Sequence, residues 1–268
     1  MMKLRIDPLL RALLSVLGVY RLYKSWLKRQ INLEEKPKHI GVILDGNRRW
    51  ASSQSRLPWE GHRVGAEKAK EFLEWCLDLG IESITLYCFS TENFNRPKEE
   101  VEELMELLEE KLKELLNSDV IHEKRVKVRV IGRIDLLPER LRQLVYQVEE
   151  ETKGYEDFYL NLAVAYGGRA EIVDAAKKIA ERVEEGELEP GEIDEGLFEK
   201  HLYTSHLPQP DPDLIIRTSG EARLSGFLLW QSAYSELFFL DVYWPEFRDI
   251  DLYRAIRSYQ RRQRRFGR

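Results

Sequence analysis

Six short apolar runs of strand length recur along the chain, and long amphipathic stretches separate most of them. The runs are HIGVILD (39–45), SITLYCF (83–89), VKVRVIG (126–132), FYLNLAV (158–164), DLIIRT (213–218) and ELFFLDV (236–242). The helical patterns cover residues 64–79, 98–117, 138–152 and 169–185. Strands that alternate with helices favour a mainly parallel sheet, because a parallel connection needs a crossover long enough to hold a helix. We therefore predict an α/β fold with helices on both faces of the sheet.

The composition is that of a globular protein with a sizeable core. Of the 268 residues, 43% are hydrophobic and 33% are charged, which excludes a disulfide scaffold, a collagen-like chain and a fully disordered chain. The two cysteines, Cys76 and Cys88, fit a reducing compartment and cannot by themselves form a Cys-rich zinc site. Residues 186–213 are rich in Gly, Pro, Asp and Glu and are interpreted as a loop with short helical pieces. We predict one domain over residues 36–268.

The net charge of −5 conceals two basic ends on an acidic body. Residues 1–30 carry seven basic side chains and one acid, and residues 254–268 carry seven arginines and no acid. The run PLLRALLSVLGVY (8–20) is too short and too charged to span a bilayer, and no signal-peptide cleavage site follows it. Its leucines recur at helical spacing, so residues 1–35 are interpreted as a basic amphipathic helix and a linker. Two interpretations stay open: the helix packs on protein, or it lies on a membrane surface.

Polar residues with affinity for anions follow the first predicted strand. The segment is Asp45-Gly46-Asn47-Arg48-Arg49-Trp50, and ligands bind beyond the carboxyl ends of strands in sheets of this kind. Backbone N–H groups at a helix start and guanidinium groups bind phosphate oxygens, while a carboxylate can hold a Mg²⁺ that bridges them. The alternative is an aspartate that caps a helix, followed by two solvated arginines. The segment is not a P-loop, because the Gly-Lys-Ser/Thr element is absent.

Two further strand ends carry similar chemistry. The second run leads into STENFNRP (90–97), for which a simple Asn/Pro loop with a helix cap is the alternative. The fifth run leads into Arg217 and Arg223, which flank a glycine turn. Glu236 lies at the start of the sixth run, where a carboxylate in an apolar strand needs a cation or a hydrogen-bond partner. Together the arginines exceed what one phosphate requires, and two diphosphates that share one Mg²⁺ would use them.

Several motifs resemble those of the cis-prenyltransferases, the undecaprenyl and dehydrodolichyl diphosphate synthases. They are HIGVILDGNRRWA (39–51), GH (61–62), LYCFSTENFNRP (86–97), AYGGR (165–169), IIRTSGEARLSGFLLWQ (215–231) and SELFFLDVYWPEF (235–247), with RRFGR at the end. The resemblance implies a six-stranded, largely parallel sheet and a hydrophobic tunnel. It implies an enzyme that adds isopentenyl diphosphate units in cis to farnesyl or geranylgeranyl diphosphate and releases diphosphate. The long-chain polyprenyl diphosphate so made is the precursor of a glycosyl carrier lipid.

The resemblance also implies a role for individual residues. Asp45 matches the catalytic aspartate that holds the Mg²⁺–diphosphate, Asn93 matches a position assigned to proton removal, and Glu236 matches a second metal carboxylate. Arg265–Gly267 resembles an element that reaches across a homodimer interface into the neighbouring site. The implied substrate-binding residues are Gly46, Asn47, Arg48, Arg49, Trp50, His62, Ser90, Thr91, Glu92, Phe94, Arg96, Arg217, Arg223, Leu224 and Ser225. The last four of these match the isopentenyl diphosphate site.

The chain departs from the family pattern at a few positions. Ser219 replaces the common second glycine of RTGGE, Gly226 replaces the usual asparagine, and Ala222 stands where several bacterial members carry a histidine. Pro58 stands where bacterial members place a basic residue, with Arg56 as the candidate substitute. The segment LPWEGH and the basic N-terminus are more similar to archaeal or eukaryotic-type members.

Two other function classes remain open. A non-catalytic scaffold subunit that pairs with an active partner tends to lose the Asp-Gly-Asn-Arg motif, which this chain keeps. A Mg²⁺-dependent phosphatase or phosphate binder would hydrolyse substrate without chain growth. If the chain is an active cis-prenyltransferase, as the resemblance implies, we expect a cytoplasmic homodimer, peripheral at the membrane face. It should bind the two diphosphates and no nucleic acid.

Overall fold

A computed structural model describes residues 19–262 of the chain, and these form two compact units. The larger unit, Pro37–Phe247, holds the whole sheet. The smaller unit contains the described residues 19–36 and 248–262. The predicted helical run at residues 8–18 lies outside the described residues, and the domain boundary after residue 35 stays a prediction.

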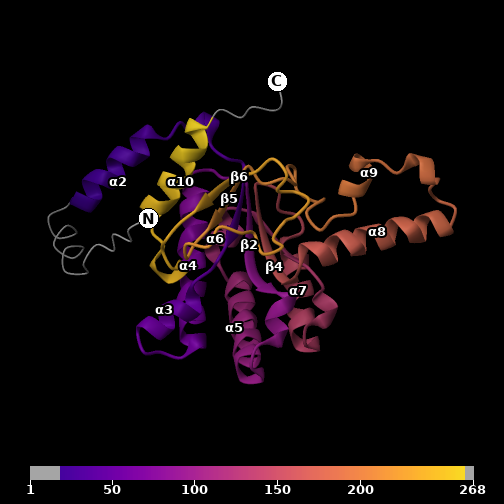
Figure 1. Ribbon diagram of the computed structural model, residues 1–268, viewed down its shortest axis with the longest axis horizontal. Helices are drawn as coiled ribbons and strands as arrows, with labels where there is room; N and C mark the ends of the chain where they lie inside the picture. The colour runs from indigo at the N-terminus through magenta and orange to yellow at the C-terminus, as the bar shows by residue number, and fades with distance from the viewer. Residues whose placement is uncertain (1–18, 263–268) are drawn as a thin grey trace. The chain divides into compact units, whose positions relative to one another are not determined.

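All six predicted strands form, and they pair in one parallel sheet (Figure 1). They are β1 (His39–Ile43), β2 (Ser83–Ser90), β3 (Val126–Ile131), β4 (Phe158–Tyr166), β5 (Leu214–Arg217) and β6 (Glu236–Phe239), in the spatial order β3-β4-β2-β1-β5-β6. Every residue of β1 and β5 is buried, whereas β6 is partly exposed at the edge. Continuous burial of the central strands is what a parallel sheet covered on both faces requires. The predicted fold class is therefore confirmed.

Helices and short 3₁₀ turns connect the strands. They are α3 (Asn47–Ser53), α4 (Pro58–Asp78), η2 (Thr91–Asn95), α5 (Lys98–Leu116), α6 (Asp119–Glu123), η3 (Ile134–Leu136), α7 (Glu139–Thr152), α8 (Gly168–Glu184), η4 (Pro190–Glu192), α9 (Glu195–Glu199) and η5 (Trp244–Glu246). Helix α5 contacts both α4 and α7. Helix α4 begins at Pro58 rather than at residue 64, because proline fits the first helical position and the Glu60 carboxylate accepts from the Leu57 N–H at 2.8 Å. Consequently His62 lies on a helix.

The smaller unit pairs α2 (Val19–Gln30) with α10 (Asp249–Arg261), and η1 (Leu33–Glu35) follows α2. Three aromatic rings of α2 each face a guanidinium of this unit: Tyr20 faces Arg248 at 5.9 Å, Tyr23 faces Arg254 at 5.1 Å, and Trp26 faces Arg257 at 4.9 Å. Lys24 also forms an ion pair with Asp249. On the other side of the helix, Leu22 is 73% exposed. The described part of the predicted N-terminal helix thus packs on protein through its aromatic face and keeps an apolar side chain in solvent.

A chain of buried polar side chains crosses the sheet. His39 Nε2 lies 2.8 Å from Thr85 Oγ1, and Asn161 donates to the same oxygen at 3.3 Å. His206 Nε2 lies 3.0 Å from Asn161 Oδ1. Burial lowers the pKa of both His39 and His206 to about 4, so both rings are neutral at pH 7. These groups lie toward the amino end of β1, which ends at Ile43.

We expect the free energy of unfolding to fall as the pH is lowered from 6.5 toward 4. The unfolded chain binds protons at the ordinary histidine pKa of about 6.5, whereas the folded pKa of His39 is about 4. The neutral His39 ring therefore contributes fully to the free energy of unfolding above pH 6.5. This contribution, about 3 kcal/mol, is lost as the pH falls from 6.5 to 4. Urea unfolding at about pH 7 and about pH 4.5 measures the difference.

The matched variants are His39→Gln, which removes the titrating group, and His201→Gln, which alters a partly exposed histidine outside the buried chain. His39→Gln should make the pH dependence shallower, with the remainder due to His206 and His62, and His201→Gln should leave it as in the wild type. An unchanged pH dependence in His39→Gln would show that the buried ring does not control acid stability.

Candidate active site

The carboxyl ends of β1, β2 and β5 lie side by side and bring three sequence motifs together. Ile43, the last residue of β1, pairs with Tyr87 of β2 and with Arg217 of β5. Asp45 follows β1 by two residues, and Ser90 ends β2. Side chains from all three strand ends line one cavity of about 1350 Å³. The register of the sheet therefore brings together residues as far apart in the sequence as Asp45 and Arg217, which are 172 positions apart.

Gly46 turns the chain from β1 into α3. Its φ is +106°, in the region that favours glycine, and a Cβ there would lie 2.7 Å from Tyr243 Cδ1. The next residue, Asn47, is buried and donates to the Leu44 carbonyl at 3.1 Å. Both backbone conformation and space thus require glycine directly after Asp45.

The Asp45 carboxylate sits between two guanidinium groups. Arg217 Nη2 donates to one carboxylate oxygen at 2.8 Å, and Arg49 Nη2 donates to the other at 3.2 Å. Burial by itself would raise the pKa of Asp45, but hydrogen bonds from Arg217 and Ser219 and the two positive charges outweigh it and lower the pKa. Asp45 is therefore ionised at pH 7, and its side chain is 27% exposed.

Arg217 is the most deeply placed cation of the site. It is only 4% exposed, and its Nη1 donates to Ser225 Oγ at 2.9 Å and to the Arg223 carbonyl. Its Nε is buried and has no hydrogen-bond partner among the described residues. A buried N–H without a partner is energetically costly, so the site keeps Arg217 in place at some cost to stability.

Glu221 ties together two arginines that sequence reasoning assigned to different diphosphates. Arg49 Nη1 donates to one Glu221 oxygen at 3.2 Å, and Arg223 Nη1 donates to the other at 2.6 Å. Sequence reasoning gave Glu221 no role. In the protein without substrate, this carboxylate supplies the negative charge that faces both guanidinium groups.

A second cationic cluster surrounds Glu100, a residue that the sequence analysis missed. Its carboxylate is 3% exposed and lies 3.1 Å from Arg96 Nη1, 3.4 Å from Arg48 Nε and 3.8 Å from His62 Nε2. Burial, with the charges of Arg96 and Arg48, lowers the pKa of His62 to about 4, so the ring is neutral. Arg96 precedes α5 and Glu100 lies in its first turn, so no regular helical spacing in the sequence signalled this pair.

The loop after β2 forms η2 and lines the same cavity with Ser90, Thr91, Glu92 and Asn93. Asn93 Oδ1 accepts from the Ser90 N–H at 3.0 Å, which fixes the shape of the turn. A carboxamide oxygen engaged in this way is a poor proton acceptor. The geometry therefore gives Asn93 a hydrogen bond that holds the loop, and its role in proton removal stays a prediction.

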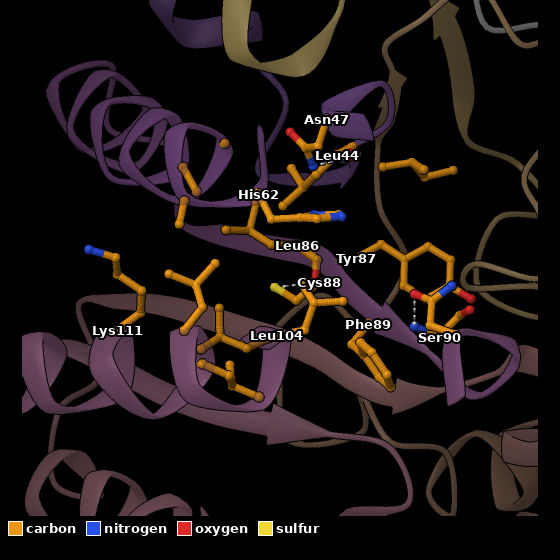
Figure 2. Close-up of a pocket in the computed structure, with 18 of the residues that line it drawn as sticks. Leu44, Asn47, His62, Leu86, Tyr87, Cys88, Phe89, Ser90, Leu104 and Lys111 are labelled. Atoms are coloured by element: carbon orange, nitrogen blue, oxygen red, sulfur yellow. Dashed lines mark hydrogen bonds between the residues drawn. The ribbon is translucent and has the colours of Figure 1, made fainter. Parts of the chain in front are cut away.

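The cavity extends from these polar groups between β2, α4 and α5. Figure 2 shows Leu86 and Cys88 of β2 and Leu104 of α5 directed into the same space, with Lys111 at the end away from Ser90. Lys111 Nζ joins α5 to α4 through Glu67 at 2.5 Å, and it also contacts Glu114. The apolar face of α5, which by default would be core, thus lines an apolar space with a polar end.

Some predicted substrate residues lie near this space but do not line it. Trp50 stacks with Arg56, whose guanidinium is 5.5 Å from its ring, and Phe94 packs edge-on against Phe89 at 4.9 Å. Leu224 packs on the core cluster around Phe227. Arg223 reaches the site through Glu221 and through its carbonyl oxygen. The remaining predicted substrate residues line the cavity or the adjoining hollow at the start of α3.

Glu236 does not lie with the other predicted site residues. It begins β6 and pairs with Leu214, whereas the Arg217 that contacts Asp45 pairs with Phe239 at the other end of the strand. All six strands are parallel, so Glu236 is at the amino edge of the sheet and Asp45 is beyond the carboxyl edge. Within one chain the two carboxylates therefore lie at opposite edges of the sheet, and the role of Glu236 as a second metal carboxylate stays a prediction. The predicted element Arg265–Gly267 lies outside the described residues.

Gly226, where the family pattern has asparagine, has a φ of +79°. Its carbonyl accepts from the Gly168 N–H at 2.9 Å, which joins the loop after β5 to the start of α8. Both glycine and asparagine tolerate the left-handed region, so this departure leaves the loop geometry intact.

Comparison with known proteins agrees with this geometry. The family described as "Putative undecaprenyl diphosphate synthase" matches residues 43–267. A tritrans,polycis-undecaprenyl-diphosphate synthase (geranylgeranyl-diphosphate specific) from Methanopyrus kandleri is 56% identical over 254 residues, which cover 95% of this chain and 93% of that protein.

Solved structures of prenyl diphosphate synthases have the same fold as this chain. A lavandulyl diphosphate synthase from Lavandula x intermedia in complex with dimethylallyl diphosphate has a TM-score of 0.83 at 40% identity, covering 88% of this chain and 100% of that one. A probable undecaprenyl diphosphate synthase from Campylobacter jejuni has a TM-score of 0.70 at 34% identity, covering 87% and 99%. The chain therefore belongs to the undecaprenyl diphosphate synthase family of cis-prenyltransferases and is a transferase that elongates prenyl diphosphates with cis isoprene units.

Proposed function

We propose that this enzyme elongates geranylgeranyl diphosphate with isopentenyl diphosphate and makes a long polyprenyl diphosphate of undecaprenyl length. The observation that most directly supports this proposal is an ionised carboxylate between two arginines at one end of a largely apolar cavity of about 1350 Å³. Such a site suits a substrate with an anionic head and a growing hydrocarbon tail. The named relatives from Methanopyrus kandleri and Methanocaldococcus jannaschii, each 56% identical, support this primer and product.

The two diphosphates would occupy the two arginine groups. Arg48, Arg49 and Arg96 would bind the allylic diphosphate, whereas Arg217 and the loop at 223–225 would bind isopentenyl diphosphate. As the allylic C1–O bond breaks, negative charge develops on the departing diphosphate, and fixed guanidinium groups stabilise it without further reorganisation. Holding the isopentenyl double bond beside C1 makes carbon–carbon bond formation effectively unimolecular.

The proton lost from the condensed intermediate needs an acceptor. Asn93 is engaged with the Ser90 N–H, and burial keeps the pKa of His62 at about 4, so neither is a strong base. We assign the proton to an oxygen of the diphosphate that was released when the allylic C1–O bond broke. Asn93 then serves to shape the loop.

The site fits a Mg²⁺ ion that enters with substrate. Among residues 19–262 no group of three His, Cys, Asp or Glu side chains could hold a metal ion. A single ionised, partly exposed Asp45 suits Mg²⁺, which protein sites commonly bind through one or two carboxylates together with substrate phosphates. When bound, Mg²⁺ would neutralise diphosphate charge and make the diphosphate a better leaving group.

Incubation with labelled isopentenyl diphosphate, Mg²⁺ and either farnesyl or geranylgeranyl diphosphate tests the reaction. We expect chain growth with preference for the geranylgeranyl primer, read by mass analysis of the products. Leu108→Trp, which adds volume inside the cavity, should shorten the products, while Leu136→Trp at a 49% exposed position should not. Release of phosphate without chain growth would instead indicate a phosphatase, and an inactive protein would indicate a scaffold subunit.

We also propose a homodimer in which the element at 265–267 reaches the partner's site, and peripheral contact with a membrane. The basic C-terminal end supports the contact with the partner's diphosphate site. The basic N-terminal end and the 73% exposed Leu22 on α2 support the contact with a membrane. No helix within residues 19–262 is long and apolar enough to cross a bilayer. Co-sedimentation with anionic vesicles should weaken when residues 1–18 are removed and when Leu22 is replaced by Glu. Equal binding by all three proteins would remove the membrane role.

A further inference from the structure

Ser219 holds a backbone conformation that glycine adopts more easily. Its φ is +74°, and it is followed by Gly220 with a φ of +77°, so two left-handed residues occur in succession. The Ser219 N–H donates to the Val242 carbonyl and the Gly220 N–H donates to the Leu240 carbonyl, each at 2.7 Å. The left-handed conformation is sterically unfavourable for a residue with a Cβ and free of that cost for glycine. A serine side chain at a position with this backbone conformation therefore suggests that the side chain has a function.

The Ser219 hydroxyl lies at the candidate active site, beside Arg49. The side chain is 6% exposed, and its Oγ accepts from Arg49 Nη2 at 2.5 Å. The same hydroxyl also helps to lower the pKa of the neighbouring Asp45 carboxyl group. One oxygen thus joins the carboxylate and the arginine that follow β1, although it belongs to the loop after β5.

Ser219 gives an exposed side chain a neutral anchor. Arg49 is 42% exposed, and besides Ser219 it contacts the carboxylates of Asp45 and Glu221 and lies over the Tyr243 ring at 5.8 Å. Glu221 would compete for the guanidinium when an anionic ligand arrives, because both are negatively charged. The neutral Ser219 hydroxyl has no such conflict, and it can keep its hydrogen bond while Arg49 binds a diphosphate oxygen through its remaining N–H groups.

We propose that the Ser219 hydroxyl is a positioning group that holds Arg49 beside Asp45, so that the cradle for the allylic diphosphate is formed before substrate arrives. This inference rests on the proposed assignment of Asp45 and Arg49 to that diphosphate. Fixing a long side chain in its binding orientation raises affinity by removing the cost of ordering it on binding. A purely conformational role for residue 219 would be served at least as well by glycine.

Two variants separate the hydroxyl from the backbone. Ser219→Ala removes the hydroxyl and keeps the Cβ, whereas Ser219→Gly removes both and relieves the left-handed strain. Ser55→Gly is the matched control, since Ser55 is an exposed serine with a φ of +55°. The full chain of each variant is titrated calorimetrically with geranylgeranyl thiolodiphosphate, an unreactive allylic analogue, without metal and without isopentenyl diphosphate. Steady-state KM values for both substrates are measured in parallel, and thermal unfolding checks the fold.

We expect both Ser219 variants to bind the analogue about tenfold more weakly than the wild type, the loss typical of one hydrogen bond to a charged group. The KM for the allylic substrate should rise to a similar extent, while the KM for isopentenyl diphosphate should change less than twofold. Ser55→Gly should match the wild type in both. Wild-type affinity in Ser219→Gly would overturn the inference, because the serine would then have only a conformational role. If the wild type itself fails to elongate any primer, the proposed function fails instead, whatever the variants do.

Discussion

Asp45→Asn should lower kcat by about 10²- to 10³-fold, the loss that follows removal of one preorganised electrostatic group from a reaction centre. Asparagine has nearly the same size, so the change isolates the charge. It removes the anion that Arg217 and Arg49 contact at 2.8 and 3.2 Å and that would hold Mg²⁺ with the substrate. The loss should therefore appear in the chemical step.

The same substitution should not weaken the binding of isopentenyl diphosphate. Without the Asp45 carboxylate, the nearly buried Arg217 and the neighbouring Arg49 keep their positive charge with less to neutralise it. We expect KM for isopentenyl diphosphate to stay within about threefold of the wild type, since cationic partners of the diphosphate remain. Asp78→Asn, at an exposed position at the end of α4, is the control for loss of one carboxylate. Single-turnover product formation measures the chemical step, and a kcat near the wild-type value in Asp45→Asn would refute the catalytic assignment.

Glu100→Gln should damage both allylic binding and stability, because one buried carboxylate organises groups from three helical segments. Arg48 comes from α3, His62 from α4, and Arg96 lies at the end of η2 just before α5. A neutral amide can accept from one arginine but cannot balance two, so partly buried guanidinium groups lose their counter-charge. We expect the free energy of unfolding to fall by about 1–3 kcal/mol and the KM for the allylic substrate to rise about tenfold.

Glu99→Gln supplies the comparison for this prediction, since the adjacent Glu99 is exposed on the same helix. Urea unfolding and steady-state kinetics on both variants separate the two effects. If Glu100→Gln is destabilised but keeps the wild-type KM, the carboxylate only supports the fold. If both variants behave as the wild type, the cluster around Glu100 has no role in binding.

The strand pattern was readable from the sequence for a simple physical reason. Central strands of a parallel sheet are buried on both faces, so they are mostly apolar, and Ile40–Leu44 in the run at 39–45 shows this directly. Asp45 was found by the same logic, because polar residues at the tip of a buried strand have to meet solvent or a ligand. The start of α4 was misplaced, since Pro58 was considered as a departure from a motif rather than as the first residue of a helix.

Residues whose role depends on a partner far away in the sequence were not accessible in this way. Glu100 looks like one of many glutamates on a solvated helix face, and only the packing of α3 and α4 against its side makes it a buried anchor. Glu236 looks like a metal ligand, and only the register Leu214–Glu236 shows that it sits at the opposite edge of the sheet from Asp45.

The sequence by itself therefore determined the alternation of strands and helices, the family, and the arginines and carboxylate of the candidate site, because local burial and local motifs encode them. The tertiary structure decided which charges face one another. It placed the Ser219 hydroxyl on Arg49, the Glu221 carboxylate between Arg49 and Arg223, and a cavity behind them. Such contacts depend on strand register and on helix packing, and these are properties of the whole fold rather than of any segment.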